Sequence, residues 1–537
     1  MNKAATVNTE NFWQTPIVIA LILALVKLAL HFVFNSYYGY FRDELYFIAC
    51  SEHLAFGYPD HAPLIAFTTK LSRTIFGDSL FAIRLFSALA GAAKILLTGL
   101  LVKELGGKRF AVFLACLCVL CVPVYFAIDN LLSMNSFEPL FWMACVYFAV
   151  LAIKRENPRY WLWFGVFAGL GLMNKHSMVF FGLAIIVGLI LTDARKVFLS
   201  KWIWIAGAVA FLIFLPNIIW QFQNNFATIE LLQNVQKSGK NVVMSPPVFV
   251  FSQIFMLLPT TAPVWIAGIW YFLADKTGKK FRFLGICYLV LLALMIFLKA
   301  KDYYLAPVYP MLFAAGAVWW EQVFNGERRK AKGENYENFN SKLSLFALRL
   351  SPLRFALPVL IVAMAIVALP FALPVLSVEN FLRYENALGI KPPKAEVSHE
   401  GALPQVYGDQ FGWQEMVEKV AAVYNSLPPE ERQKTGIYAS NYGEAGAIDF
   451  FGAKYGLPKA ISGHQSYFLW GHHGYTGEVL IVLGSKREDA EKNCQSVEEK
   501  TEVNHPYSMN EEKYKILICR GLREPLPDLW AKLKHWN

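Results

Sequence analysis

Residues 17–44, IVIALILALVKLALHFVFNSYYGYFRDE, hold the two features that decide the fold. The part up to residue 34 is an apolar run interrupted only by one lysine and one histidine. Such a run is close to the roughly 20 residues that a helix needs to cross a bilayer. The run ends in aromatic residues and then in Arg42, Asp43 and Glu44. We therefore predict a spanning helix that brings two carboxylates to a membrane surface.

Ten further apolar runs follow, at residues 80–102, 110–127, 137–153, 161–173, 178–191, 202–220, 248–273, 283–298, 305–320 and 355–376. The composition agrees, because 56% hydrophobic and 17% charged residues are far from the balance of a soluble domain. We predict a polytopic α-helical membrane protein with about 11 transmembrane helices. Two of the runs, 161–173 and 178–191, are short and could form a broken pair.

Basic residues gather in alternate connections between these runs. The basic connections lie at residues 103–109, 154–159, 195–201, 276–282 and 328–354. The positive-inside rule puts them, and the N-terminus, in the cytoplasm. This topology explains the net charge of +10 better than nucleic-acid binding does. An odd number of crossings then puts everything after residue 376 outside.

The part after residue 376 lacks long apolar runs. Strand-like pieces at 436–439 and 479–483 alternate with helical ones such as 414–426. We predict a transmembrane domain over 1–376 and an extracytoplasmic α/β domain over 377–537. Cys494 and Cys519 lie in the second domain and could pair in an oxidising compartment or remain two free thiols.

The first outer loop, residues 37–78, is the first place where chemistry is expected. Asp43 is the first candidate for a base that accepts a proton from an attacking hydroxyl, although Asp43 and Glu44 could also be a solvated acidic pair. Asp60 and His61 lie between prolines later in the loop. His61 could bind phosphate, and with Asp60 it could hold a metal, or the two could merely cap a turn.

The other outer turns carry ionisable residues at helix ends. Lys175, Lys299 and Lys301 would together form a cationic pocket on the side where topology does not call for positive charge, and a lipid-borne phosphate suits such a pocket. The alternative is that each lysine reaches its own headgroup. Asp129, Asn135 and Glu138 lie around the second outer turn.

Five segments carry a resemblance to a known family: YFRDE (40–44), DHAPL (60–64), GLGLMNKHS (169–177), KDYYLAPVYP (301–310) and NYGEAGA (441–447). Their order along the chain resembles the lipid-dependent GT-C glycosyltransferases. The branch that they resemble is the bacterial family 39/83 type, which is similar to protein O-mannosyltransferases and to the lipid A aminoarabinose transferase.

The resemblance implies a glycosyltransferase of the bacterial inner membrane, with its C-terminal domain periplasmic. The donor would be a polyprenyl-phosphate sugar, the acceptor lipid A, another envelope glycan or a protein, and the anomeric carbon would invert. Asp43 would be the general base and Glu44 would support it. The donor phosphate would be held by six residues with cationic, imidazole or hydroxyl side chains: Lys175, Lys301, His61, Arg42, Tyr303 and Tyr304.

Related enzymes carry an aspartate in the second outer loop, where this chain reads SMNSFEPLFW at residues 133–142. Glu138, Asp129 or Asp60 could supply the second acidic site, or Asn135 could replace it without charge. We assign no metal ligands, and a divalent metal stays possible because relatives differ in this requirement.

A transporter or flippase for lipid-linked sugars is the alternative from another functional class. Transporters tend to show paired halves and polar residues at the middle of interrupted helices. Here the polar residues gather at one face, and no repeat is visible in the sequence. This asymmetry favours an enzyme.

Overall fold

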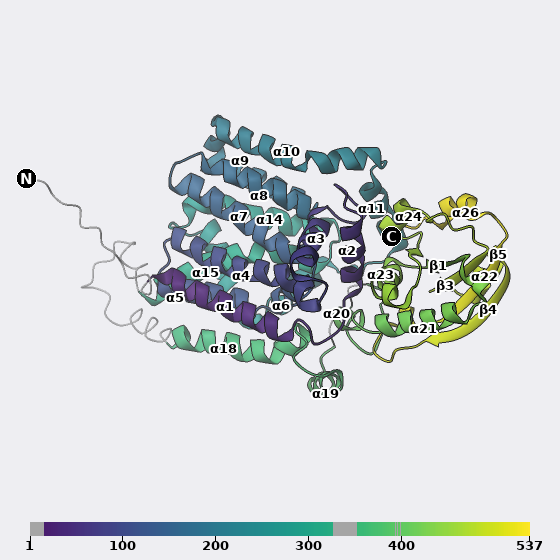
Figure 1. The fold of residues 1–537 in the computed structure, drawn as a ribbon. Coiled ribbons are helices and arrows are strands. Elements are labelled where there is room, and N and C mark those ends of the chain that lie inside the picture. The colour runs from purple at the N-terminus through teal and green to yellow at the C-terminus, as the bar shows by residue number, and fades with distance from the viewer. Residues whose placement is uncertain (1–14, 326–351, 392–393, 395, 398) are drawn as a thin grey trace, which may run out of the picture.

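The computed structural model describes residues 15–325, 352–391, 394, 396–397 and 399–537. Figure 1 shows a bundle of long helices and a smaller part that contains a β-sheet. The short helices α2 and α3 lie between these two parts, across the ends of the long helices.

Every predicted apolar run forms one helix or a bent pair of helices. The bundle contains α1 (Pro16–Phe34), α4 (Leu80–Glu104), α5 (Arg109–Cys121), α6 (Pro123–Asn130), α7 (Met134–Lys154), α8 (Tyr160–Asn174), α9 (Met178–Ile190), α10 (Lys201–Gln223), α12 (Pro246–Met256), α13 (Ala262–Leu273), α14 (Arg282–Phe297), α15 (Tyr309–Phe324) and α18 (Leu353–Ala368).

The sequence suggests one broken helix, formed by the runs 161–173 and 178–191, but the structure has its bends elsewhere. The short runs form α8 and α9, which are separate helices because α8 packs mainly on α7 and α10 whereas α9 packs on α14. The chain bends by 60° between α5 and α6 and by 91° between α12 and the segment Pro259–Leu273. In these two bent pairs a proline follows the break, where its missing N–H and fixed φ favour a new helix start. A third bend, of 107°, lies between α9 and the short segment Asp193–Leu199.

Helix length and composition alone do not confirm the predicted number of membrane crossings. Among the described residues, six helices are long and apolar enough to cross a membrane, or up to nine spans if each bent pair counts as one. Shorter helices such as α8, with 15 residues, and α15, with 16, are not in that count. The count of 11 therefore stays a prediction. The basic residues at 328–349, used for orientation, lie outside the described residues.

The connections form two groups at opposite ends of the bundle. At one end, Lys154 and Arg155 pair with Glu104, and Lys280 pairs with Glu156. These residues belong to the basic connections or border them. The other end adjoins α2, α3 and the sheet-containing part (Figure 1), so the two ends of the bundle differ as the alternation of basic residues predicts.

The predicted outer loop 37–78 is largely helical. It forms α2 (Arg42–Glu52) and α3 (Leu64–Phe76). Glu44 begins α2 by accepting a hydrogen bond from the backbone N–H of Phe41 at 2.9 Å, which satisfies one of the free donors of the first turn. Asp43 is therefore fixed on a helix instead of lying on a flexible loop.

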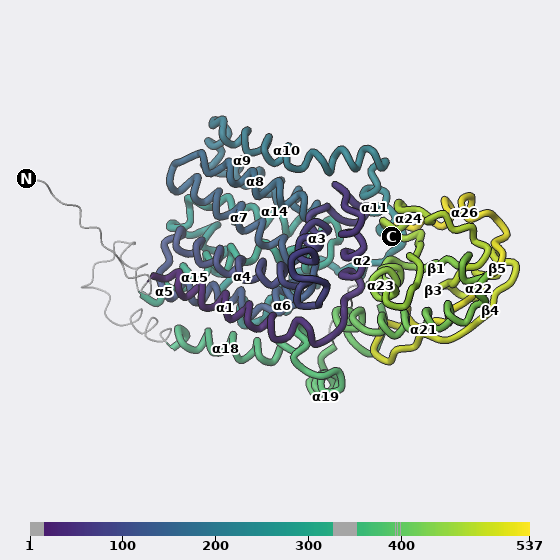
Figure 2. Tube along the Cα trace, in the orientation of Figure 1, coloured from purple at the N-terminus to yellow at the C-terminus, as the bar shows by residue number. Residues whose placement is uncertain are grey.

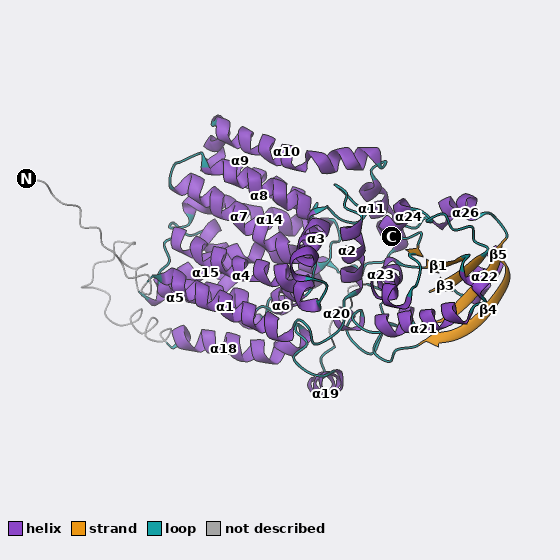
Figure 3. Ribbon diagram, viewed as in Figure 1, coloured by secondary structure: helices purple, strands orange, loops and turns teal. Residues whose placement is uncertain are grey.

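The smaller part contains a five-stranded sheet of β1 (Thr435–Ala439), β2 (Ala460–Ile461), β3 (Val479–Leu483), β4 (Cys494–Val503) and β5 (Tyr514–Leu522). Figure 3 shows these strands in orange, in the order β2-β1-β3-β5-β4. β1 pairs in parallel with β2 and β3, whereas β5 is antiparallel to β3 and β4. The two predicted strands are β1 and β3, and the predicted helix is α21 (Trp413–Ser426).

Helix α2 shares a hydrophobic core with the sheet. Buried residues of α2 such as Leu45 and Ile48 pack in one cluster with Ile437 of β1 and Ile481 of β3. Figure 2 traces α2 beside α23 (Tyr442–Phe451). A Cβ on Gly446 of α23 would lie 2.9 Å from the backbone of Leu45, so glycine permits this close approach. The predicted boundary at residue 376 therefore does not separate two independent cores.

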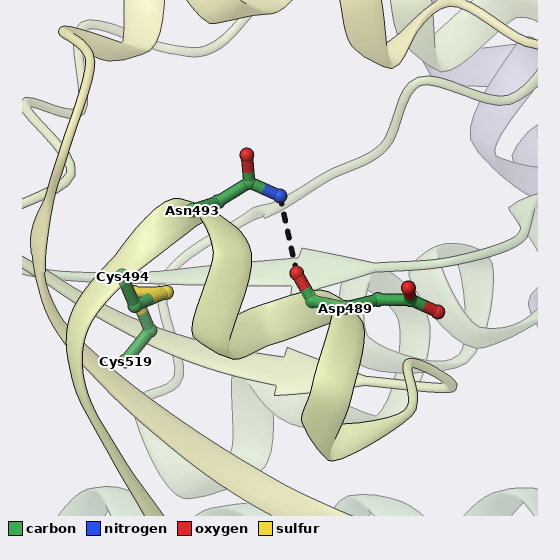
Figure 4. The surroundings of a disulfide bond; sticks show 4 residues. All are labelled: Asp489, Asn493, Cys494 and Cys519. Carbon is green, nitrogen blue, oxygen red and sulfur yellow. Dashed lines mark hydrogen bonds between the residues drawn. A yellow bond between two sulfur atoms is a disulfide. The ribbon is translucent and has the colours of Figure 1, made fainter.

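Cys494 of β4 and Cys519 of β5 form a disulfide (Figure 4). Beside it, Asn493 donates a hydrogen bond to the carbonyl of Asp489 at 3.2 Å, at the end of α25 (Arg487–Asn493). Of the two possibilities that the sequence leaves open, the structure has the paired form.

Replacing both of these cysteines by serine should lower the stability of the sheet. Closing a loop with a sequence separation of 25 residues is expected to contribute about 3 kcal/mol, mainly by restricting the unfolded chain. Thermal unfolding of the purified protein, with and without reductant, measures the effect. Reductant should lower the unfolding temperature of the wild type and leave that of the double variant unchanged. Equal unfolding temperatures of the two proteins without reductant would contradict the prediction.

Candidate functional site

Asp43 lies in the first turn of α2 and faces the sheet-containing part. Its carboxylate accepts a hydrogen bond from the hydroxyl of Tyr442 at 2.7 Å. The Tyr442 ring lies 4.7 Å from that of Tyr46, and the Tyr46 hydroxyl donates to Asp60 at 2.9 Å. Burial raises the pKa of Asp60, and the charge of Asp43 adds to this effect. The structure thus brings two predicted acidic residues around one pair of tyrosines.

Glu44 has a different environment from its neighbour. Its carboxylate is fully buried and accepts two hydrogen bonds from Arg84 of α4, at 2.8 and 2.7 Å. It also accepts one from the backbone N–H of Leu132 at 2.8 Å. This bidentate ion pair ties α2 to α4 and to the start of α7, and so supports the position of Asp43. Sequence reasoning missed Arg84, although a lone arginine inside an apolar run is a signal of function.

The predicted cationic group assembles around Tyr304. Lys175, which follows α8, donates to Glu138 and to Asn135, both at 2.8 Å, and lies over the ring of Tyr304 at 4.4 Å. Ser177 donates a further hydrogen bond to Glu138. Glu138 is therefore the acidic residue of the second outer turn that reaches the predicted phosphate site.

Lys301 adjoins the same group, because its carbonyl accepts a hydrogen bond from the backbone N–H of Tyr304 at 3.1 Å. The ring of Tyr303 lies 4.9 Å from that of Tyr304. The Lys301 ammonium donates to Glu396 at 2.7 Å. Burial favours the neutral carboxyl of Glu396, but Lys240 and Lys301 outweigh burial and hold its pKa below the ordinary value. Glu396 was not identified from the sequence, because its partner is 95 positions away.

Arg42 contacts other parts of the protein in this structure, and its role at the donor phosphate stays a prediction. Its guanidinium donates to Glu511 at 2.7 Å and lies 3.4 Å from His399. Burial would lower the pKa of His399, but the hydrogen bond with Glu511 raises it above the ordinary value. Since His399 also lies 3.4 Å from Glu396, this network joins the Asp43 end of α2 to Lys301. Arg42 connects parts of the protein, and its charge is already matched by a carboxylate.

His61 also contacts its own part of the chain, and its role at the donor phosphate stays a prediction. It is buried, its Nδ1 lies 2.9 Å from the carbonyl oxygen of Ala62, and its ring stacks on Tyr58 with centroids 4.4 Å apart. These contacts fit the alternative in which His61 only caps a turn. Among the described residues, no group of three or more histidines, cysteines, aspartates or glutamates is placed to hold a metal ion.

Asp129 is separate from the acidic residues at the end of the bundle. It lies on α6, fully buried, with Lys27 of α1 at 2.9 Å and Lys94 of α4 at 3.0 Å. A Cβ on Gly91 of α4 would lie 2.5 Å from this carboxylate, so glycine leaves room for it. Two ammonium groups already neutralise Asp129, which argues against the predicted role in the second acidic site. Sequence reasoning did not identify Lys27 and Lys94, although each is a charge within an apolar run.

The arrangement of helices and sheet is shared with solved structures. The structure is similar to that of ArnT from Cupriavidus metallidurans bound to undecaprenyl phosphate, with a TM-score of 0.57 and 13% identity, covering 93% of this chain and 97% of that one. The apo structure of the same protein gives a TM-score of 0.54 with 13% identity, over 94% and 97% of the chains. At 13% identity these likenesses show a shared fold, which agrees with the resemblance seen in the sequence.

Sequence comparison leads to the same class. The family model of dolichyl-phosphate-mannose-protein mannosyltransferases matches residues 60–220. The lipid A galacturonosyltransferase RgtD of Rhizobium johnstonii is 26% identical over 203 residues, which are 36% of this chain and 41% of RgtD. The matched part thus spans about two fifths of that relative's length.

Proposed function

We propose that the chain is an integral membrane glycosyltransferase. It moves a sugar from a polyprenyl-phosphate-linked donor to lipid A, or to another envelope glycan or a protein, on the periplasmic face of the bacterial inner membrane. The observation that carries the proposal is the combination of Asp43 fixed on α2 with the cationic group of Lys175 and Lys301 at the same end of the bundle. The similar structure with undecaprenyl phosphate and the two sequence matches support it.

In the proposed reaction Asp43 accepts the proton of the acceptor hydroxyl while the oxygen attacks the anomeric carbon of the donor sugar. The new bond forms on the face opposite to the phosphate, so the anomeric carbon inverts. The bond from carbon to the phosphate oxygen breaks, and the electron pair leaves with the polyprenyl phosphate. Lys175 and Lys301 stabilise this negative charge, which is electrostatic work that pre-positioned cations do well away from bulk water.

Lys175 pairs with Glu138, and Lys301 pairs with Glu396. The donor phosphate must therefore either displace these carboxylates from the lysines or bind to the lysines beside them. Both carboxylates also hold the lysines in place before the donor arrives. Tyr303 and Tyr304 lie between the lysines and can donate to phosphate or contact the prenyl chain.

Transfer of labelled sugar from polyprenyl phosphate tests the proposal. Membranes from cells that lack the gene, complemented with the wild-type chain, are supplied with a panel of donors. Transfer from one donor to a lipid or glycan fraction supports the proposal and identifies the sugar. If no donor is used but the lipid-linked sugar changes its membrane face, the flippase alternative replaces the enzyme.

Replacing Lys175 by glutamine should reduce transfer about thirtyfold, which is the loss of about 2 kcal/mol expected for one hydrogen bond to a charged phosphate. The reduction is measured as kcat/KM for the donor. Lys299→Gln is the matched control, because Lys299 is an exposed lysine at the same end of the bundle. Equal losses in both variants would point to general surface charge and contradict the assigned role of Lys175.

A further inference from the structure

A cavity of about 510 Å³ lies where the bundle end meets the sheet. Arg42 of α2 and Lys240, which follows α11 (Ala227–Ser238), line it on the bundle side. Ser440, Tyr442 and Gly484 line it on the sheet side. Tyr442 also bonds Asp43, so the cavity adjoins the proposed base. No step of the proposed reaction uses this cavity.

The topology of the sheet makes this position suited to a ligand. Ser440 directly follows β1, and Gly484 directly follows β3. From β1 the chain goes through α23 to β2 on one side, whereas β3 is the parallel neighbour on the other side. The carboxyl ends of β1 and β3 therefore form a switch point, and ligands of open α/β sheets bind in the crevice outside such a point.

The side chains around the cavity offer hydrogen bonds instead of apolar contact. Val397 is the one aliphatic residue among the described residues that line it, and the rest are mostly hydroxyl, amide, imidazole and charged groups. Glu511 balances Arg42, and Glu396 lies 3.7 Å from Lys240, so the cations are matched. The Nε of Arg42 is buried and lacks a hydrogen-bond partner among the described residues. A ligand oxygen could accept a hydrogen bond from this N–H.

We infer that this cavity binds the saccharide portion of the acceptor. A saccharide offers many hydroxyl donors and acceptors without an apolar chain, which suits both the lining and the balanced charge. Tyr442 adds an aromatic surface beside Asp43. A sugar held there presents a hydroxyl to Asp43, while the donor phosphate stays with Lys175 and Lys301. The inference rests on the proposed function and gives the sheet-containing part the role of acceptor recognition.

Two variants alter the cavity without touching Asp43, Lys175 or Lys301. Lys240→Gln removes one cation of the lining. Gly239→Asn adds a side chain at a lining position where a Cβ has no atom within 4 Å and φ is +65°, a conformation that asparagine tolerates. Lys492→Gln on the exposed surface of α25 is the matched control.

We expect each cavity variant to raise KM for the acceptor about tenfold, as for the loss of one hydrogen bond to a charged group. In Gly239→Asn the kcat and the KM for the donor should change less than about twofold, because this substitution leaves the partners of Lys175 and Lys301 in place. Lys240→Gln also removes a charge beside Glu396, the partner of Lys301, so for this variant the evidence is the change in acceptor KM relative to the change in donor KM. Lys492→Gln should equal the wild type. If the cavity variants transfer sugar with an unchanged acceptor KM, the inference is wrong and the proposed function still stands.

Direct binding gives a second measurement that does not need turnover. The wild-type protein in nanodiscs is titrated calorimetrically with the fully deacylated saccharide of lipid A. Binding that weakens about tenfold in Lys240→Gln and Gly239→Asn supports the inference. No binding by the wild type, or equal binding by all variants, overturns it. A wild type that binds the saccharide but transfers no sugar contradicts the proposed function alone.

Discussion

Replacing Asp43 by asparagine should lower sugar transfer at least about a hundredfold, the lower end of what a positioned general base contributes. The substitution keeps the size of the side chain and can still accept the hydrogen bond from Tyr442, but it cannot take a proton. The loss should fall on kcat, with the KM for the donor little changed. Single-turnover transfer from a labelled polyprenyl-phosphate sugar measures it.

The matched control for this experiment is Glu52→Gln at the other end of the same helix. Glu52 is an exposed carboxylate that pairs with Arg73 and Lys459, and such surface pairs contribute little to stability. Tyr442→Phe removes one hydrogen bond and leaves the carboxylate, so it should cost less activity than Asp43→Asn. Full activity of Asp43→Asn in a folded protein would exclude Asp43 as the base.

Replacing Asp129 by asparagine should destabilise the bundle by about 3–5 kcal/mol, because it leaves buried charges without their partner. Lys27 and Lys94 are both fully buried and both bind this carboxylate. Without it, two ammonium groups face each other inside the bundle. Thermal unfolding of the detergent-solubilised protein measures the change.

A compensating variant distinguishes a structural role from a catalytic one. Changing Lys27 and Lys94 to methionine together with Asp129→Asn removes all three charges, and replacing a whole buried ion cluster by apolar groups is often neutral. Recovered stability with normal transfer would assign Asp129 to structure alone. Recovered stability without transfer would return Asp129 to the second acidic site. Unchanged stability of the single variant would contradict the account of the cluster.

Local pattern was enough to predict the helices and several residues of the site. The apolar runs correspond to the bundle helices because length and composition determine which segments suit a bilayer. Lys175 lies over the ring of Tyr304, beside Tyr303, because the segment after α8 and the segment before α15 both lie at the same end of the bundle. Whether they bind the donor phosphate stays a prediction.

The partners of these residues could not be predicted, because they come from distant parts of the chain. Tyr442 lies 399 positions from Asp43, and Glu396 binds Lys301 only after the segment following α19 (Val378–Leu388) returns to the bundle. His61 and Arg42 were assigned to phosphate from local motifs alone. Their actual contacts, with Tyr58 and Glu511, depend on packing that a motif does not contain.

The core that α2 shares with β1 and β3 has a consequence for biosynthesis. Translation produces Asp43 early, but the strands against which its helix packs are made about 400 residues later, at roughly 5–20 residues per second. Until β5 closes the sheet, α2 lacks its packing partners and Tyr442 is not in place. Under the proposed function, we therefore expect a partly made chain to transfer no sugar until the sheet has folded.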